Sequence, residues 1–373
     1  MKIFDQIINF ENTNIYNGFD LDNTFFFDIE TTGLSPKNSM IYLIGIMYFD
    51  KEWHLKQWIL DNAADEENML IDFTQLITSK CLKNVVHFNG TTFDCKFVDD
   101  HCSVYGIKFS FAEFTQIDLY KVYTKYKSIL SLENLKQKSI EFSYGINRKD
   151  KLSGKELIKL YKDYLLNKKT DNEELLLLHN FEDIVNLPVL FNVMALDDLF
   201  KSNFEISSFN ISENSEHGEA TISLSNLLPP FVNISNYYNI EYLDQIKSSE
   251  GDSYKYRMIF GEVKKETLKF FYEDYKNYYY LPNEDMAVHK SMAEFIDKGK
   301  KVKANKTNCY TKVTGEYISI MEKPLISKKY TEADLDCFKD IKIFKDDDGN
   351  SYIRISEFEN KEFIRKYINY ILK

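Results

Sequence analysis

The first 200 residues are predicted to form a layered α/β domain, in which helices pack on a sheet. Three β-rich segments follow one another at 25–27, 40–49 and 53–60, and a helix, a short apolar strand and further helices come after them. This order of elements is typical of α/β folds. The chain has 373 residues, more than the roughly 250–300 that one hydrophobic core usually serves. A smaller mixed α+β domain is therefore expected after it, with domains at 1–200 and 201–373.

The three β-rich segments predict an antiparallel meander. Phe25, Phe26 and Phe27 are consecutive aromatics, as in a buried strand. Residues 40–49 are rich in β-formers, and residues 53–60 alternate apolar with polar side chains. Because only a short turn separates the last two segments, the three strands are expected to pair in chain order.

Helices are expected to dominate the rest of the first domain. Apolar residues at helical spacing predict a helix over 64–78. Residues 85–88 then form a short buried strand, and a second helix is expected from about Thr92. Pro188 removes a backbone donor and is expected to bend the last helix. Further helices are predicted over 118–126, 131–135, 153–166 and 172–200.

Residues 202–218 are rich in Ser, Asn and Glu, which places the domain boundary there. Beyond this boundary the pattern changes to short strands around a tyrosine-dense segment at 270–280. The predicted elements are strands over 204–206, 221–224 and 254–263, a helix over 283–297, and a hairpin over 310–320 that turns at Thr314-Gly315.

Composition excludes several classes of protein. The chain is 44% hydrophobic and 15% aromatic, unlike a disordered chain. Its five cysteines are odd in number and contain no C-x-x-C pair, which argues against a disulfide framework or a structural zinc site and for a reducing compartment. We see no signal-peptide pattern, and the longest apolar run, 41–49, is too short to span a bilayer. A cytoplasmic location without membrane association is therefore expected.

Negative charge is concentrated in the first half of the chain. Of the net charge of −11, residues 1–200 contribute 21 − 30 = −9 and residues 201–373 contribute 26 − 28 = −2. The balance argues against a large non-specific DNA-binding surface but allows a local basic groove. Five lysines at 298–306, near the tyrosines, fit either a phosphate-tracking surface or an ordinary solvated face.

Two carboxylates follow the aromatic strand directly. Asp28 and Glu30 are one residue apart, so they project from the same face of a strand. Like charges held that close repel unless a cation lies between them, and Mg²⁺ and Mn²⁺ prefer such oxygen ligands. The alternative is a strand that runs into a polar turn, with both acids in water.

Two further acidic signals lie at other places in the first domain. Asp94 follows the strand at 85–88, where ligands of open α/β sheets gather, although an acid in a first helical turn also suits the helix dipole. His179 and Asp183 interrupt an apolar helix and lie within about 40° of each other on one face. The alternative for this pair is a solvent-exposed helix face.

These motifs resemble those of a known superfamily. The sequence Asp-Ile-Glu-Thr-Thr-Gly-Leu at 28–34, Asn-Gly at 89–90 with Phe-Asp at 93–94, and the segment 179–183 are similar to the three motifs of DEDD-superfamily 3′–5′ exonucleases. Within it, the resemblance is closest to the YprB-like ribonuclease-H-like domain proteins of bacteria. It implies a ribonuclease-H-like mixed sheet flanked by helices, and hydrolysis of single-stranded nucleic acid or 3′ ends, DNA or RNA, to nucleoside 5′-monophosphates.

The resemblance also implies a role for each residue. Asp28 would bridge two divalent ions, Mg²⁺ or Mn²⁺, Glu30 and Asp183 would complete the site of the ion carrying the nucleophile, and Asp94 would support the second ion. His179 would be the general base. The spacing departs from the family pattern. Superfamily members carry either a Tyr four residues before the last Asp or a His five before it, whereas this chain has His179 four residues before Asp183 and Leu178 five before it.

Three polar residues are candidates for substrate binding. Thr31 and Thr32 would receive the terminal nucleotide, or serve only the turn. Asn89 would contact the substrate or cap the helix. Two alternative functions remain at this point: a non-catalytic nucleic-acid-binding module on the same fold, and a metal-dependent phosphoesterase for small molecules.

Overall fold

The computed structural model describes residues 1–10, 15–212, 214, 216–230, 232, 238–248, 252–320 and 338–372. The chain forms two compact units. The first unit comprises Met1–Asp197 and Ser225–Val232, and the second comprises Asp198–Leu224 and Asn233–Lys373. None of the helices in the described ranges has the length and apolar character needed to cross a membrane.

A six-stranded mixed sheet forms the centre of the first unit, in the order β1-β4-β3-β2-β5-β6. The predicted meander is confirmed, since β2, β3 and β4 pair antiparallel in sequence order. Strands β5 and β6 join parallel to β2, which makes the sheet mixed. The strands are β1 (Lys2–Ile8), β2 (Thr24–Thr31), β3 (Ile41–Asp50), β4 (Glu52–Ile59), β5 (Asn84–His87) and β6 (Thr115–Asp118).

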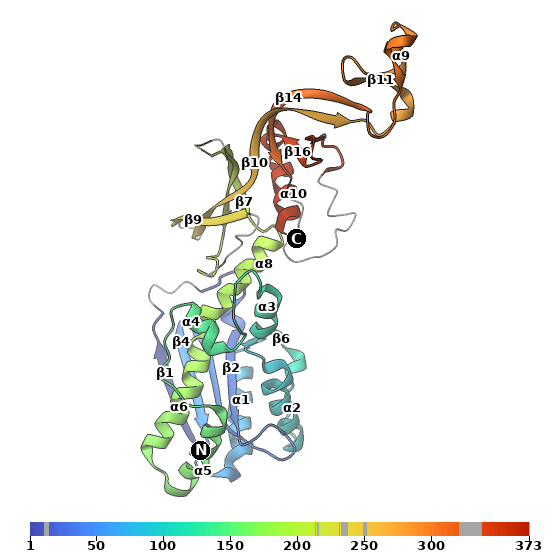
Figure 1. Ribbon diagram of the computed structural model, residues 1–373. Helices are drawn as coiled ribbons and strands as arrows, with labels where there is room; N and C mark the ends of the chain where they lie inside the picture. Colours follow the sequence, from blue (N-terminus) through green and yellow to red (C-terminus); the bar gives the residue numbers. More distant parts are fainter. Residues whose placement is uncertain are drawn as a thin grey trace. The chain divides into compact units, whose positions relative to one another are not determined.

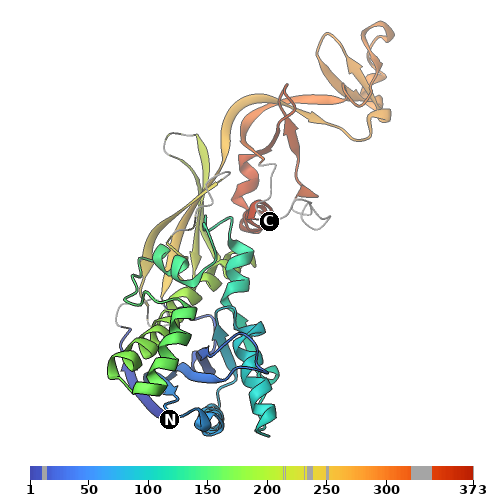
Figure 2. The same ribbon diagram turned by 60° about the horizontal axis from the view of Figure 1, so that its bottom comes forward.

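Helices cover both faces of this sheet (Figures 1 and 2). On one face the rings of Phe27 and Phe73 stack at 5.7 Å, which holds α1 on β2. On the other face Tyr42 stacks on Tyr161 of α5 at 4.0 Å. The principal helices are α1 (Glu66–Ser79), α2 (Asp94–Val104), α5 (Gly154–Asn167) and α6 (Thr170–Val185), and the shorter ones are α3 (Leu119–Tyr126), α4 (Gln137–Ser143), α7 (Leu187–Leu190) and α8 (Met194–Phe200).

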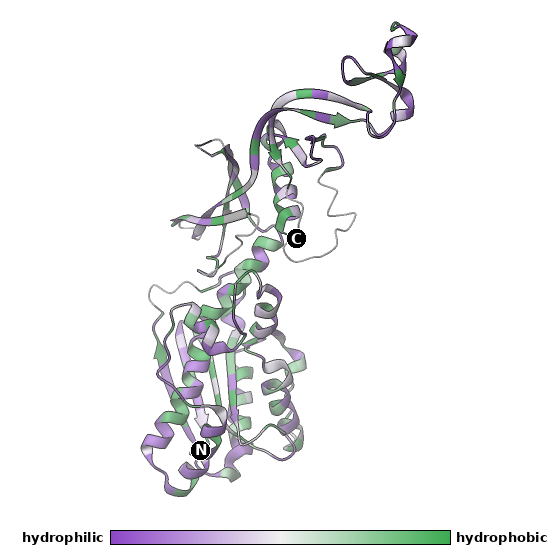
Figure 3. Ribbon diagram, viewed as in Figure 1, coloured by the Kyte–Doolittle hydropathy of each residue, from purple (hydrophilic) through white to green (hydrophobic). Residues whose placement is uncertain are grey.

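The core lies between the sheet and its helices. Alternate residues of β2, Phe25, Phe27 and Ile29, are buried against α1 and α2. The middle strands are accordingly hydrophobic in Figure 3, and polar residues lie mainly on the helices. The acids of β2 occupy the opposite face of the strand because side chains alternate.

Several predictions for the first unit need correction. Residues 131–135 are not helical, because Ser131 has a φ of 50° and so lacks the extended backbone of a helix-capping residue. The helix predicted over 172–200 is divided into α6, α7, a 3₁₀ turn and α8, because Pro188 cannot donate to the carbonyl four residues earlier. Strands β1 and β6 were not predicted.

The second unit is rich in strands. The 19-residue strand β10 pairs with β8 and β9 over its first half and with β14 and β15 over its second. Gly261, with φ +64°, lies at the switch, where a Cβ would come within 2.3 Å of Ile318 Cγ2. The elements are β7 (Glu205–Ile211), β8 (His217–Leu224), β9 (Tyr238–Ile246), β10 (Ser253–Phe271), β14 (Tyr310–Ser319), β15 (Ile343–Lys345), β16 (Ser351–Arg354) and α10 (Lys361–Leu372).

Residues 202–218, where the sequence predicts the domain boundary, contain β7 and the start of β8. Two other predictions for the second half are wrong. Residues 310–320 are one strand, because Thr314 and Gly315 continue the pairing with β10. The helix predicted over 283–297 is reduced to α9 (Lys290–Ala293), next to β11 (Tyr278–Leu281), β12 (Met286–His289) and β13 (Val302–Lys303).

Candidate active site

Strand β2 presents Asp28 and Glu30 toward helix α6. Asn180 Nδ2 donates to Asp28 Oδ2 at 2.9 Å, and Glu30 Oε1 lies 3.4 Å from His179 Nε2. The alternation of the strand therefore places both acids on the helix side, as the sequence predicts.

The close approach of α6 depends on a glycine. Gly45 of β3 pairs with Asp28, and a Cβ at this position would lie 2.1 Å from Asn180 Oδ1 and 2.2 Å from Ile184 Cδ1. Gln57 of β4 holds the same amide, because its Nε2 donates to Asn180 Oδ1 at 2.8 Å. Sheet and helix are thus fixed at the point where the acids meet.

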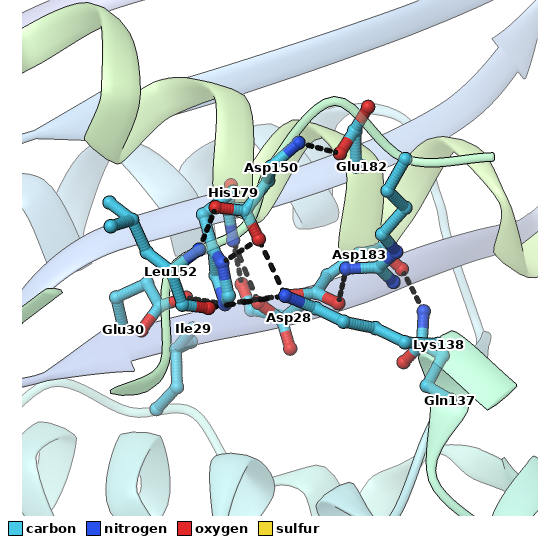
Figure 4. Close-up of polar contacts among 12 residues, drawn as sticks. Asp28, Ile29, Glu30, Gln137, Lys138, Asp150, Leu152, His179, Glu182 and Asp183 are labelled. Atoms are coloured by element: carbon cyan, nitrogen blue, oxygen red, sulfur yellow. Dashed lines mark hydrogen bonds and ion pairs between the residues drawn. The ribbon is translucent and has the colours of Figure 1, made fainter. Parts of the chain in front are cut away.

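His179 and Asp183 project from one face of α6, as their four-residue spacing predicts. His179 Nε2 lies 3.1 Å from Asp183 Oδ2. Ligand atoms of Glu30, His179 and Asp183 all lie within 4.8 Å of one another. Two elements distant in the sequence, β2 and α6, therefore meet in one cluster (Figure 4).

Asp94 approaches the same cluster from the start of α2. Its Oδ1 accepts a hydrogen bond from the backbone N–H of Ile29 at 3.2 Å, and its charge contributes to the raised pKa of Asp28. Gly90 leaves room for it, since a Cβ there would lie 3.1 Å from Asp94 Oδ2. Asp94 therefore lies beside the residue between Asp28 and Glu30, whereas the residues whose ligand atoms lie within 4.8 Å of one another are Glu30, His179 and Asp183.

Burial and mutual repulsion raise the pKa values of three of these carboxyls. Burial, followed by the charges of the neighbouring acids, raises the pKa of Asp28 well above its usual range. Burial raises the pKa of Glu30 to about 8, with His179 opposing the shift. Burial also raises the pKa of Asp94 to about 7, opposed by its hydrogen bond from Ile29. The cluster carries more negative charge than its surroundings stabilise.

Asp183 and His179 shift in ways that favour an ion pair. Burial acts to raise the pKa of Asp183, but His179 and Arg148 outweigh it, and the pKa lies below its ordinary value. Burial acts to lower the pKa of His179, but Asp183, Glu30 and Asp150 raise it to about 9. Each shift favours the charged form, so the two side chains stabilise each other as an ion pair.

The second nitrogen of His179 contacts a residue that the sequence analysis did not single out. His179 Nδ1 lies 2.7 Å from Asp150 Oδ2, and the same oxygen accepts a hydrogen bond from Lys138 Nζ at 2.6 Å. Glu182 accepts the backbone N–H groups of Lys149 and Asp150, each at 2.9 Å. Glu182 therefore holds the loop that carries Asp150 (Figure 4).

Arg148 in the same loop holds the other end of the cluster. Its Nη1 lies 2.6 Å from Asp183 Oδ1, and its Nη2 donates to Glu141 Oε1 at 2.6 Å. Arg148 and Glu141 are both buried. The buried arginine thus fixes Asp183 from the side opposite His179.

The predicted substrate-binding residues lie at the end of β2 and shortly after β5. The Thr31 hydroxyl donates to the Gly33 carbonyl at 2.8 Å, and the Thr32 hydroxyl accepts from Met40 N at 3.0 Å, so both already serve the turn after β2. Asn89 has a φ of 62° and no side-chain capping bond, and its side chain is exposed. Helix capping, the alternative role for Asn89, is therefore wrong.

The donor set fits hard divalent cations. Carboxylate oxygens predominate, as Mg²⁺ and Mn²⁺ prefer, and the raised pKa values of Asp28, Glu30 and Asp94 show unbalanced negative charge. Cations bound at this position would neutralise that charge.

Comparison with known proteins gives one match, to a superfamily, over part of the chain. A family model of the RNase H superfamily matches residues 25–195. No curated protein is matched by the chain. Residues 25–195 thus form a ribonuclease-H-like domain, and the match supports hydrolysis of phosphodiester bonds in nucleic acid as the general activity.

Proposed function

We propose that this protein is a metal-dependent 3′–5′ exonuclease that releases nucleoside 5′-monophosphates from single-stranded nucleic acid or 3′ ends, DNA or RNA. One observation carries the proposal: ligand atoms of Glu30, His179 and Asp183 lie within 4.8 Å of one another in a partly buried cluster, with Asp28 bonded to the neighbouring Asn180 and Asp94 bonded to the backbone of Ile29. A cluster of this charge repels a phosphate unless cations are bound, so it suits hydrolysis better than simple binding.

Each acid has a role in the proposed site. Asp28 would bridge two Mg²⁺ or Mn²⁺ ions. Glu30 and Asp183 would complete one of the two ion sites, and Asp94 would support the other. Such a pair of ions, when bound, activates a water molecule and stabilises the charge that develops on the scissile phosphate and its leaving oxygen.

His179 is the proposed general base. The Asp150 carboxylate is an acceptor, so Nδ1 carries the proton of that 2.7 Å contact. Nε2 is then the atom that takes the proton of the attacking water, and it faces Glu30 and Asp183 at the cluster. Cations bound by the neighbouring carboxylates of Glu30 and Asp183 would weaken the attraction that raises the pKa of His179. Asp150 is a positioning residue, because it acts through His179.

Thr31, Thr32 and Asn89 would receive the 3′ end of the nucleic acid. Asn89 presents an exposed amide directly before the Gly90–Thr92 turn. It is the proposed contact to the terminal nucleotide. Thr31 and Thr32 would contribute through the turn that their hydroxyls stabilise.

A 5′-labelled single-stranded oligonucleotide incubated with Mn²⁺ tests the proposal. We expect a ladder of products that shorten from the 3′ end, and no products with EDTA or with Asp28→Asn. Asp163→Asn is the matched control, since Asp163 is an exposed acid of α5 outside the cluster. An oligonucleotide that stays intact but is retarded in a gel would favour the binding module, and internal cuts would contradict the exonuclease.

A further inference from the structure

Residues 272–309 form a small module inserted between two paired strands of the second unit. Strands β10 and β14 pair out to Phe271 and Tyr310, and the chain between these residues folds into its own sheet, in the order β12-β11-β13. Figure 1 labels β11 and α9 of this module beyond the paired ends of β10 and β14. The proposed nuclease chemistry uses none of these residues.

The tyrosines of the module divide between two faces. Tyr278 and Tyr280 pack on a small core around Ala287, and Tyr278 stacks on Tyr272 with ring centroids 4.4 Å apart. Because side chains alternate along a strand, Tyr279 points to the opposite face of the sheet.

The face that carries Tyr279 is basic. Tyr279 pairs with Lys303 across β11 and β13, and Lys301 Nζ lies 5.3 Å from the centroid of the Tyr279 ring. The Lys301 ammonium also donates to the carbonyl of Ala293, so the segment after α9 lies beside this face. We call Tyr279, Lys301 and Lys303 the outward face.

Large apolar side chains next to the outward face are exposed to solvent. Phe295, two residues after Ala293, is 90% exposed, and Met292 is 66% exposed. Such exposure is costly for an aromatic ring unless a partner covers it. Exposed rings beside lysines are typical of surfaces on which bases stack and phosphates are held.

The charge of this region contrasts with that of the chain. Residues 298–306 hold five lysines and no acid, while the whole chain has a net charge of −11. Lys298, Lys300, Lys303 and Lys306 are exposed, and in the part of the chain that the structure describes no ion pair engages them. Their positive charge is therefore available to an external anion.

We propose that the outward face, with Phe295, Lys298 and Lys300, binds single-stranded nucleic acid. The lysines contact successive phosphates, and the rings of Tyr279 and Phe295 stack on bases. The choice of nucleic acid over an anionic membrane rests on the proposed function, since a nuclease acting on long strands gains affinity from a second contact with the same strand.

Binding of a fluorescent 20-nucleotide single strand, DNA or RNA, to the full chain tests this inference. EDTA prevents cleavage during the measurement. We expect Lys298→Glu/Lys300→Glu/Lys303→Glu to weaken binding at least tenfold at 0.1 M salt. The slope of log K against log salt should become shallower by about 2, because about 0.7 counterion is released per contacted phosphate. Phe295→Ala should weaken binding severalfold with the salt slope unchanged.

The matched control reverses the charge of three exposed lysines elsewhere in the second unit. The control variant is Lys339→Glu/Lys345→Glu/Lys361→Glu. Equal loss of binding in this control, or full affinity in the module variant, would overturn the inference. Loss of binding to phosphatidylserine vesicles without loss of oligonucleotide binding would also overturn it, in favour of a membrane.

A small substrate separates this inference from the proposed activity. Cleavage of thymidine 5′-(p-nitrophenyl phosphate) with Mn²⁺ needs only the cluster of acids, so the module variant should cleave it at the wild-type rate. If wild-type protein leaves this ester and oligonucleotides intact yet binds strands through the lysines, the exonuclease proposal fails and the binding face stands. The reverse result removes only the binding face.

Discussion

The carboxylate of Asp150 lies 2.7 Å from the imidazole of His179, although 29 residues separate them in the chain. Lys138 and the N–H of Leu152 bind the same carboxylate, and with His179 they outweigh the effect of burial, so the pKa of Asp150 lies below its ordinary value. The fixed negative charge of the Asp150 carboxylate beside Nδ1 favours one tautomer of His179 and one orientation of its ring.

Replacing Asp150 should impair catalysis without impairing binding. We expect Asp150→Asn to lower kcat about 10–100-fold with little change in KM, because the amide no longer selects the tautomer of His179. His179→Ala should lower kcat about 10²–10⁴-fold. Steady-state kinetics on an oligonucleotide measures both values.

A double variant distinguishes positioning from a general structural role. If Asp150 acts through His179, adding Asp150→Asn to His179→Ala should cost almost nothing further. Full additivity of the two losses would show that Asp150 acts independently of the imidazole.

Removal of one acid from the cluster should stabilise the metal-free protein. Asp28→Asn relieves the repulsion from Glu30, Asp94 and Asp183. The free energy of unfolding of this variant in EDTA should therefore be higher than that of the wild type by on the order of 1 kcal/mol, and its melting temperature should rise accordingly. The increase in melting temperature that Mn²⁺ gives the wild type should be lost at the same time. Differential scanning calorimetry measures both, and a lower melting temperature in EDTA would contradict a repulsive cluster.

The buried pair of Arg148 and Glu141 should be costly to break and tolerant of joint replacement. Arg148→Ala leaves Glu141 buried without its partner and should cost about 3–5 kcal/mol in urea unfolding. Arg148→Met/Glu141→Met should recover most of that stability. It should not recover nuclease activity, because Asp183 has lost the guanidinium that holds its Oδ1.

The size of residue 45 should control the position of α6. Gly45→Ala places a methyl group within 2.2 Å of Asn180 and Ile184, so it should destabilise the fold by about 1–3 kcal/mol and lower activity by displacing His179. Gly154→Ala is the matched control, since nothing lies within 4 Å of a Cβ there. Equal effects of the two substitutions would contradict the close approach of helix and strand.

The free energy of unfolding should decrease as the pH rises, because of His101, a histidine outside the cluster. His101 Nδ1 lies 2.8 Å from Glu66 Oε1 and its Nε2 lies 2.9 Å from the Pro36 carbonyl. The hydrogen bond to Glu66 raises the pKa of His101 above its ordinary value, although burial opposes the shift. A raised folded-state pKa gives stability that is complete below the unfolded-state pKa of about 6.5 and lost as pH rises through the folded value.

The free energy of unfolding of the wild type should therefore fall as the pH rises above about 6.5, and that of His101→Gln should fall less. Urea titrations at a series of pH values measure the difference. Parallel pH profiles for the two proteins would show that His101 does not carry this dependence.

Local patterns sufficed to predict much of the first unit. The aromatic run before Asp28 marks β2, and the reciprocal bonds of Ser153 and Glu156 start α5 where the sequence predicts a helix. The side on which Asp28 and Glu30 project follows from the period of a strand alone. The separation of His179 and Asp183 follows equally from the period of a helix.

Other features depend on contacts that no local pattern contains. Strand β6 has only four residues, and it pairs with β5 through the fold. Arg148 and Asp150 belong to a loop whose charges look like ordinary solvent-exposed residues, and only the fold brings them to α6. Asn180 carried a usable signal, since a polar side chain next to His179 in an apolar helix calls for a buried partner.

Diffraction from crystals soaked in Mn²⁺ locates the bound cations without relying on activity. We expect two anomalous peaks roughly 3.5–4 Å apart, within bonding distance of carboxylate oxygens of Asp28, Glu30, Asp94 and Asp183. A map in which manganese avoids these four side chains while occupying sites elsewhere would contradict the proposed two-metal site.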